Sequence, residues 1–128
     1  MYLKSAGVDQ AVFTAVLSGE FELGLAEHQF IELLDDAVAS GATKVLIDGR
    51  EMTGNPTGFE RFLYSTFTAY AALDVLFRHN LRLKFAYVIH EPLRDPERFG
   101  EILALNAGMD VKTFEEMNEA LEWLNGDL

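Results

Sequence analysis

Apolar residues occur along the chain in short runs that predict strands separated by helices. Residues 12–17 are β-branched, aromatic and apolar, and a Ser-Gly pair follows them, which is typical of a strand that ends in a turn. Apolar runs at 44–48 and 83–89 predict two buried strands, and 111–113 predicts a brief one. We expect residues 2–6 to form a further short strand that pairs with 12–17.

Helical periodicity fills the intervals between these runs. Residues 25–40 place Phe30 and Leu34 on one face, and Gly41 is a suitable C-terminal cap. The next helix is long, and we expect its inward face to be the one whose residues recur at helical spacing. These residues are Phe59, Phe62, Leu63, Thr66, Phe67, Tyr70 and Leu73.

Two further helices are predicted by their caps. Asp95 followed by Pro96 is typical of a helix start, with a helix that runs to about Ala107. Thr113 and Glu116 have the spacing of a capping box ahead of the last helix. We expect that helix to turn Phe114, Met117, Leu121 and Leu124 inward, with Trp123 beside them.

The order of elements predicts an α/β fold. Strands joined through helices pair in parallel, so we expect a mixed, mostly parallel β-sheet with helices packed on it. The N-terminal pair of strands should form a hairpin at the edge of this sheet. A chain of 128 residues fits one domain, spanning 1–128.

Composition narrows the classes of function. A net charge of −11 and only three lysines argue against nucleic acid as a partner. There is no cysteine, which is compatible with a reducing, cytoplasmic location, and we see no signal peptide and no integral membrane segment. The three histidines fall in separate elements, so we expect no metal site and no cofactor.

The stretch 49–58 has the strongest functional character. It is rich in glycine and polar residues, and it joins a predicted strand to the long helix. We therefore expect it to be a loop where strand ends and a helix N-terminus meet, a common place for ligands. The candidate binding or switch residues are Asp48, at the end of the preceding strand, and five residues of the stretch itself: Arg50, Thr53, Asn55, Thr57 and Gly58.

The same residues also have purely structural interpretations. Thr57 and Glu60 have the spacing of a capping box, and Asn55-Pro56 is an alternative helix start. Asp48 can bond the backbone of its own turn. The loop carries no complete nucleotide-binding motif, because Asn55 stands where a P-loop requires lysine.

Three segments together resemble the STAS-like superfamily, and its SpoIIAA-like branch in particular. They are VLIDGREMTG, DPERFGEILALNAGMDVKTF and EEMNEALEWL. The resemblance implies a regulatory module like the anti-sigma-factor antagonists, in which a phosphorylated Ser or Thr opens the second helix. Thr57 would stand at or beside that position, with Asn55 in place of the family's Asp. The relation of this branch to SEC14-type lipid carriers implies a small apolar ligand.

Three hypotheses of function follow. The first, which we favour, is a non-catalytic regulatory module that binds a protein partner through the 49–58 stretch. The second is a domain for a small apolar ligand or lipid, with Phe59, Phe62, Tyr64, Phe67 and Tyr70 of the long helix lining a pocket. A packed core or a homodimer seam is the favoured explanation of these aromatic residues. Tyr64 lies off the main stripe, so we expect some aromatic surface to be exposed and available for self-association. The third is an enzyme centred on Asp48, Arg50 and Thr57, although no catalytic set is complete, so we expect no enzymatic activity.

Overall fold

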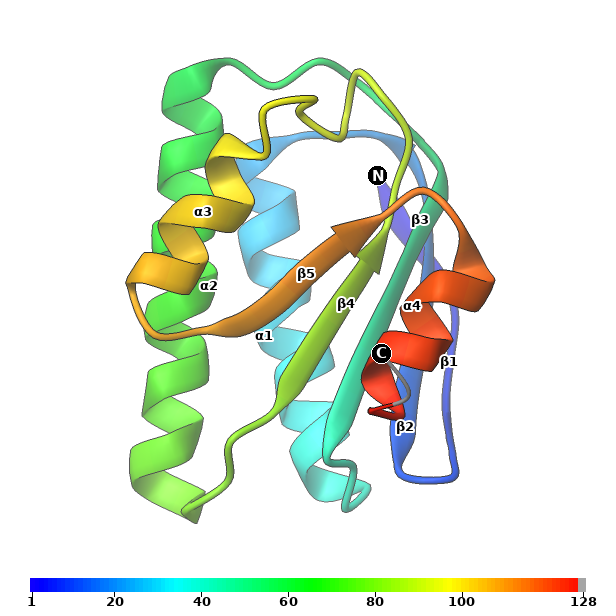
Figure 1. The fold of residues 1–128 in the computed structure, drawn as a ribbon, viewed down its shortest axis with the longest axis vertical. Helices are drawn as coiled ribbons and strands as arrows, with labels where there is room; N and C mark the ends of the chain where they lie inside the picture. Colours follow the sequence, from blue (N-terminus) through cyan, green and yellow to red (C-terminus); the bar gives the residue numbers. More distant parts are fainter. Residues whose placement is uncertain (127–128) are drawn as a thin grey trace.

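The fold is a five-stranded mixed sheet in which the strands lie in sequence order (Figure 1). The structure is a computed structural model, and it describes residues 1–126. The first two strands pair antiparallel, and every later neighbour pairs parallel, which confirms the predicted fold class and the edge hairpin. The strands are β1 (Tyr2–Asp9), β2 (Val12–Glu20), β3 (Lys44–Thr53), β4 (Lys84–Val88) and β5 (Asp110–Phe114).

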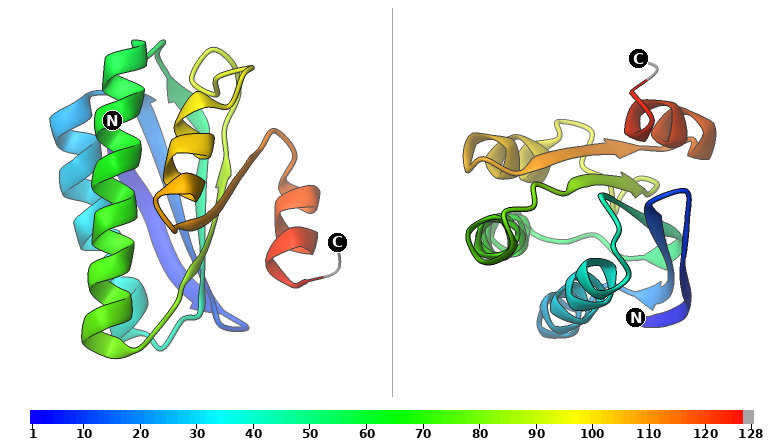
Figure 2. Two further views of the ribbon diagram at one scale, coloured as in Figure 1. Left: turned by 60° about the vertical axis from the view of Figure 1, so that its left-hand side comes forward. Right: turned by 90° about the horizontal axis from the view of Figure 1, so that it is seen from below.

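Helices cover both faces of the sheet, as the two views of Figure 2 show. Three of them pack on one face, whereas the last lies alone on the other. Among residues 1–126, no helix is both long and apolar enough to cross a membrane. The helices are α1 (Leu23–Ala39), α2 (Gly58–His79), α3 (Phe99–Asn106) and α4 (Met117–Leu124).

The two-residue period of the strands assigns their side chains to the two faces. On β3, Val45 and Ile47 belong to the core under α1 and α2, while Leu46 between them belongs to the core under α4. Central parallel strands are buried on both faces, which is why 44–48 reads as a continuous apolar run. The run therefore predicted the strand without showing which face each residue serves.

Strand β3 extends further than the sequence predicted. Residues 49–53 are strand rather than loop, because the end of β2 continues alongside them. Gly19 pairs with Met52 and Glu20 with Thr53, beyond a register shift that follows Val16. The extra pairs give hydrogen-bond partners to a polar backbone that would otherwise form a loop. The true loop is only four residues long, 54–57.

Two predicted helix starts are wrong and one is confirmed. Helix α3 begins at Phe99 rather than near Pro96, because Arg98 takes a left-handed conformation (φ 56°) at its N-cap. Thr113 lies within β5, and α4 follows Glu116 without a side-chain cap, so that capping box does not form. The box at the start of α2 does form: Thr57 accepts from the Glu60 amide, and the Glu60 carboxylate accepts from the Thr57 amide.

Candidate functional site

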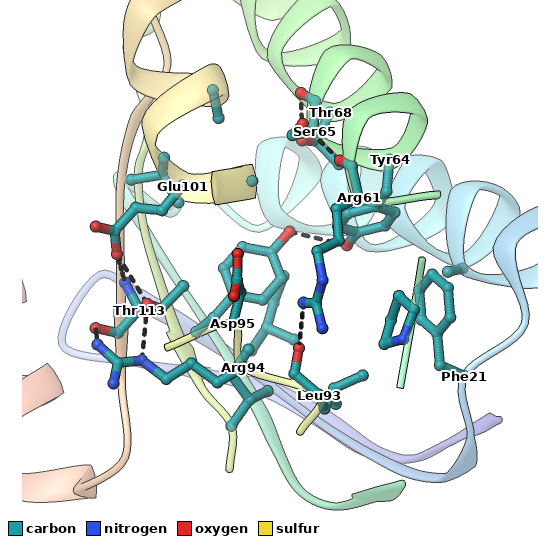
Figure 3. Close-up of a pocket in the computed structure, with 18 of the residues that line it drawn as sticks. Phe21, Arg61, Tyr64, Ser65, Thr68, Leu93, Arg94, Asp95, Glu101 and Thr113 are labelled. Carbon is teal, nitrogen blue, oxygen red and sulfur yellow. Dashed lines mark hydrogen bonds between the residues drawn. The ribbon is translucent and has the colours of Figure 1, made fainter. Parts of the chain in front are cut away.

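A cavity of about 140 Å³ lies where the parallel strands end, between the sheet and helices α2 and α3 (Figure 3). This volume is comparable to the roughly 150 Å³ of an apolar cavity that holds a benzene-sized molecule. Its walls come from β2, β3, β4 and β5, from helices α1, α2 and α3, and from connecting segments that include the one after β4. Apolar side chains make up most of the lining, among them Leu17, Phe21, Ile47, Ile89, Leu93 and Met109.

Small side chains on the helices leave this space open. Ser65 and Thr68 of α2 are buried and border the cavity, and their hydroxyls donate to carbonyls of their own helix. Gly100 and Ala104 of α3 border it from the other side. These four residues are small, and the cavity lies between them and the carboxyl end of the sheet.

A pair of tyrosines provides the main polar feature inside. The hydroxyls of Tyr64 on α2 and Tyr87 on β4 lie 2.9 Å apart and share one hydrogen bond. Removal from water raises the pKa of Tyr64 to about 12 and that of Tyr87 well above its ordinary value. Both groups are therefore neutral phenols at physiological pH. One tyrosine hydroxyl donates this hydrogen bond and the other accepts it. The accepting hydroxyl still has its own proton, which it can donate to a further acceptor.

Two arginines fix the segment that covers the cavity. Arg61 of α2 donates to the carbonyls of Pro92 and Leu93, at 2.8 and 2.7 Å. Arg94 donates to the hydroxyl of Thr113 on β5 at 3.0 Å. The segment after β4 is thus tied to α2 on one side and to β5 on the other, as Figure 3 shows. Both guanidinium groups use neutral oxygens in these contacts and bring positive charge to the cavity.

Glu101 is a buried carboxylate whose partners are all supplied by neighbours. It accepts from the amide and the hydroxyl of Thr113, and Arg98 donates to it at 2.9 Å. Its side chain is 1% exposed. A buried charge that is paired and fully hydrogen-bonded is a structural element, joining the start of α3 to β5.

The predicted site residues do not meet at this cavity. Asp48 and Arg50 form a two-pronged ion pair within β3, at 2.9 and 2.8 Å. Asp48 lies two residues after Leu46 and therefore on the face that carries α4. Hydrogen bonding to Arg50 lowers the pKa of Asp48, although burial opposes the shift. Asp48 also accepts from the Arg50 amide, which agrees with the structural interpretation of this residue.

The remaining predicted residues surround the start of α2. Thr53 is exposed at the end of β3, and Thr57 is exposed at the N-cap. Asn55 and Gly58 border a second, shallow hollow, formed with the 91–99 segment. The structure thus separates the six candidates into an ion pair on one face and a group at one helix end.

The orientation of α2 corrects the predicted pocket lining. Phe59 is 69% exposed and Tyr70 is 66% exposed, so most of the face expected to turn inward turns outward, although Phe67 packs against the core as predicted. Five aromatic residues of α2 were predicted to line a pocket, and of these only Tyr64 borders the cavity. Tyr64 is the one that lies off the main aromatic stripe. The signal that identifies the inner face is the small polar pair Ser65 and Thr68, on the side of the helix that carries Tyr64.

Comparison with models of known protein families and with curated proteins finds no match for the chain.

Proposed function

We propose that this chain binds a small, largely apolar molecule carrying one oxygen acceptor, and that it binds without catalysis. The observation that carries the proposal is the apolar cavity with the Tyr64–Tyr87 pair inside it. Ligand sites are typically concave and apolar, with few polar groups that fix the orientation. Their place outside the carboxyl ends of parallel strands is also typical.

The tyrosine pair supports a ligand with an acceptor oxygen. A phenol proton left without an acceptor in apolar surroundings costs free energy, and a ligand oxygen removes that cost. A carbonyl, ether or carboxylate oxygen would serve. The SEC14-like relation implied by the sequence agrees with this class of ligand, and a larger ligand would need the 91–99 segment to move outward.

The test uses two substituted benzenes of nearly equal size, acetophenone and isopropylbenzene. Acetophenone has a carbonyl oxygen where isopropylbenzene has a methyl group. We expect both to shift the amide NMR signals of Leu17 and Ile47, and acetophenone to bind about fivefold more tightly, as a net hydrogen bond of about 1 kcal/mol predicts. The double variant Tyr64→Phe/Tyr87→Phe should bind both probes equally. Tyr70→Phe, on the outer face of α2, is the matched control and should keep the difference.

Two results would contradict this proposal. Shifts confined to surface residues would show that the cavity does not admit a ligand. Equal affinities of the two probes for the unmodified protein would leave the tyrosine pair without a role in recognition. Extraction of freshly purified protein with organic solvent, followed by mass spectrometry, should then identify the natural ligand.

A second candidate is the regulatory, protein-binding module that the STAS-like resemblance implies. The exposed hydroxyl of Thr57 supports it, because it stands at the N-terminus of α2 beside the hollow that Asn55 and Gly58 border. A phosphoryl group there would add negative charge at the positive end of the helix. Mass spectrometry of protein from its own host should find phosphate on Thr57, and Thr57→Glu should abolish capture of a partner that Thr57→Ser retains.

A further inference from the structure

The outer face of α2 is an exposed apolar surface that runs the whole length of the helix. Phe59 is 69% exposed, Tyr70 66% and Phe77 84%, and Phe62 beside them is 42% exposed. Figure 2 shows α2 standing forward between α1 and α3. Large apolar side chains left in water along one continuous stripe mark a surface that is covered when the protein works.

The spacing of this stripe is symmetric about its centre. Six uncharged residues along this face are spaced alternately by four and three residues, which is the repeat of a helix that packs against another helix. Read from either end, the order of residue types is Phe, Leu, then a hydroxyl-bearing residue. We define the seam as these six residues: Phe59, Leu63, Thr66, Tyr70, Leu73 and Phe77.

From this symmetry we infer that the seam binds the seam of a second copy of this chain, with the two α2 helices antiparallel. A two-fold axis near the middle of α2 pairs Phe59 with the partner's Phe77 and Leu63 with the partner's Leu73. Thr66 then lies against the partner's Tyr70. A self-complementary surface of this kind is what an isologous dimer requires, whereas a different protein would need no such symmetry.

Charge agrees with a second copy as the occupant. Each chain carries a net charge of −11, so two copies repel least when they meet on an uncharged surface. None of the six seam positions is charged. Glu60 and Arg78 stand 18 residues apart, about five helical turns, and so lie on the same flank of the seam. The antiparallel arrangement places Glu60 of each copy beside the partner's Arg78.

The exposed area is sufficient for a dimer. At roughly 200 Å² per aromatic side chain, the four exposed aromatic residues of α2 present about 500 Å². A standard interface buries roughly 800 Å² on each partner. Helix α3 packs beside α2 and adds Phe99, Ile102 and Leu105, each more than 40% exposed, which can supply the difference.

Sedimentation velocity tests the association. We expect the unmodified protein to sediment as a dimer and the double variant Tyr70→Glu/Phe77→Glu as a folded monomer, because both side chains are exposed in the single chain and lie outside its core. Val8→Glu is the control, since Val8 is an exposed apolar residue on β1 and should leave the dimer intact. An unmodified protein that is monomeric, or a dimer that survives the double substitution, would overturn the inference. Monomers that bind neutral lipid vesicles through the seam would overturn it as well.

Cysteine cross-linking tests the direction, because the chain has no cysteine of its own. A chain with Phe59→Cys is mixed with a chain with Phe77→Cys and oxidised. The antiparallel seam predicts that disulfides form mainly between the two different chains. A parallel arrangement would instead link like to like, joining Cys at 59 to 59 and 77 to 77, and would contradict the proposed two-fold. The experiment is independent of ligand binding, so either proposal can fail alone.

Discussion

The two faces of the sheet are covered in different ways. Helix α4 alone covers one face, and its fully buried Ala120 and Leu124 close against Leu46 and Val88. Within residues 1–126, no side chain of α4 borders the cavity. Three helices cover the other face, and yet the cavity is there. The face that three helices cover is thus less completely packed than the face that α4 covers alone.

The difference shows that the cavity results from side-chain size and not from a lack of helices. Leu124 is a large side chain that fills the space under α4. Under α2 and α3 the corresponding contacts are made by Ser65, Thr68 and Ala104, which stop short of the sheet. Close packing is the normal state of a protein interior, so a hollow held open by small residues points to a use.

The largest expected effect is a loss of unfolding free energy on shortening a buried leucine, and it should differ between one leucine on each face. Leu124→Ala on the filled face should cost about 4 kcal/mol of unfolding free energy, because the atoms removed leave a new hole among close-packed neighbours. Leu17→Ala should cost only about 2–3 kcal/mol, because Leu17 already borders the cavity and has fewer packing partners to lose. Urea unfolding measures both. Equal losses would mean that the wall at Leu17 is as tightly packed as the α4 side.

The next effect comes from enlarging two small side chains, one on each face. Ala120→Leu should destabilise the protein by about 1–3 kcal/mol, since Ala120 is fully buried and has no room for three further carbons. Ala104→Leu should cost less than about 1 kcal/mol, because its side chain can extend into the cavity. The same variant should bind acetophenone more weakly. Thermal unfolding and probe titration of the two variants test this, and a severe loss of stability in Ala104→Leu would show that Ala104 does not face the hollow.

The sequence predicted much of the frame, because the frame depends on local signals. The apolar run at 44–48 and the capping box at Thr57 need only neighbouring residues, and both elements form where predicted. The continuation of β3 through 49–53 was not predicted. It depends on pairing with β2, and no local property of Gly49 or Arg50 shows that a distant strand extends beside them.

The cavity was missed for a related reason. Periodicity finds the stripe of large apolar residues on α2 but not the direction in which it points. The usual assumption that the most apolar face turns inward failed here, since Phe59 and Phe77 face outward while Ser65 and Thr68 face the core. A long exposed aromatic stripe marks a surface that a partner covers. The second copy inferred above would do so, and the same principle of burial would then hold for the dimer.

The last expected effect follows from the tyrosines, which belong to the cavity face alone. Unfolded tyrosines lose their protons near pH 10, whereas Tyr64 holds its proton to about 12 and Tyr87 is also raised. Above about pH 10 the folded state therefore binds more protons than the unfolded state, and stability falls as pH rises toward 12, by up to about 1.4 kcal/mol per unit for each tyrosine. Below pH 10 both states keep these protons, so the pair adds no pH dependence.

Urea unfolding between pH 9 and pH 11 checks this against the double variant Tyr64→Phe/Tyr87→Phe. The variant removes only the contribution of the pair, and all other titrating groups cancel in the difference. We expect the unmodified protein to lose stability with the steeper slope. Parallel slopes would mean that water reaches both hydroxyls. The tyrosines would then be solvated, and the contrast between a hollow that keeps them from water on one face and a filled core on the other would be lost.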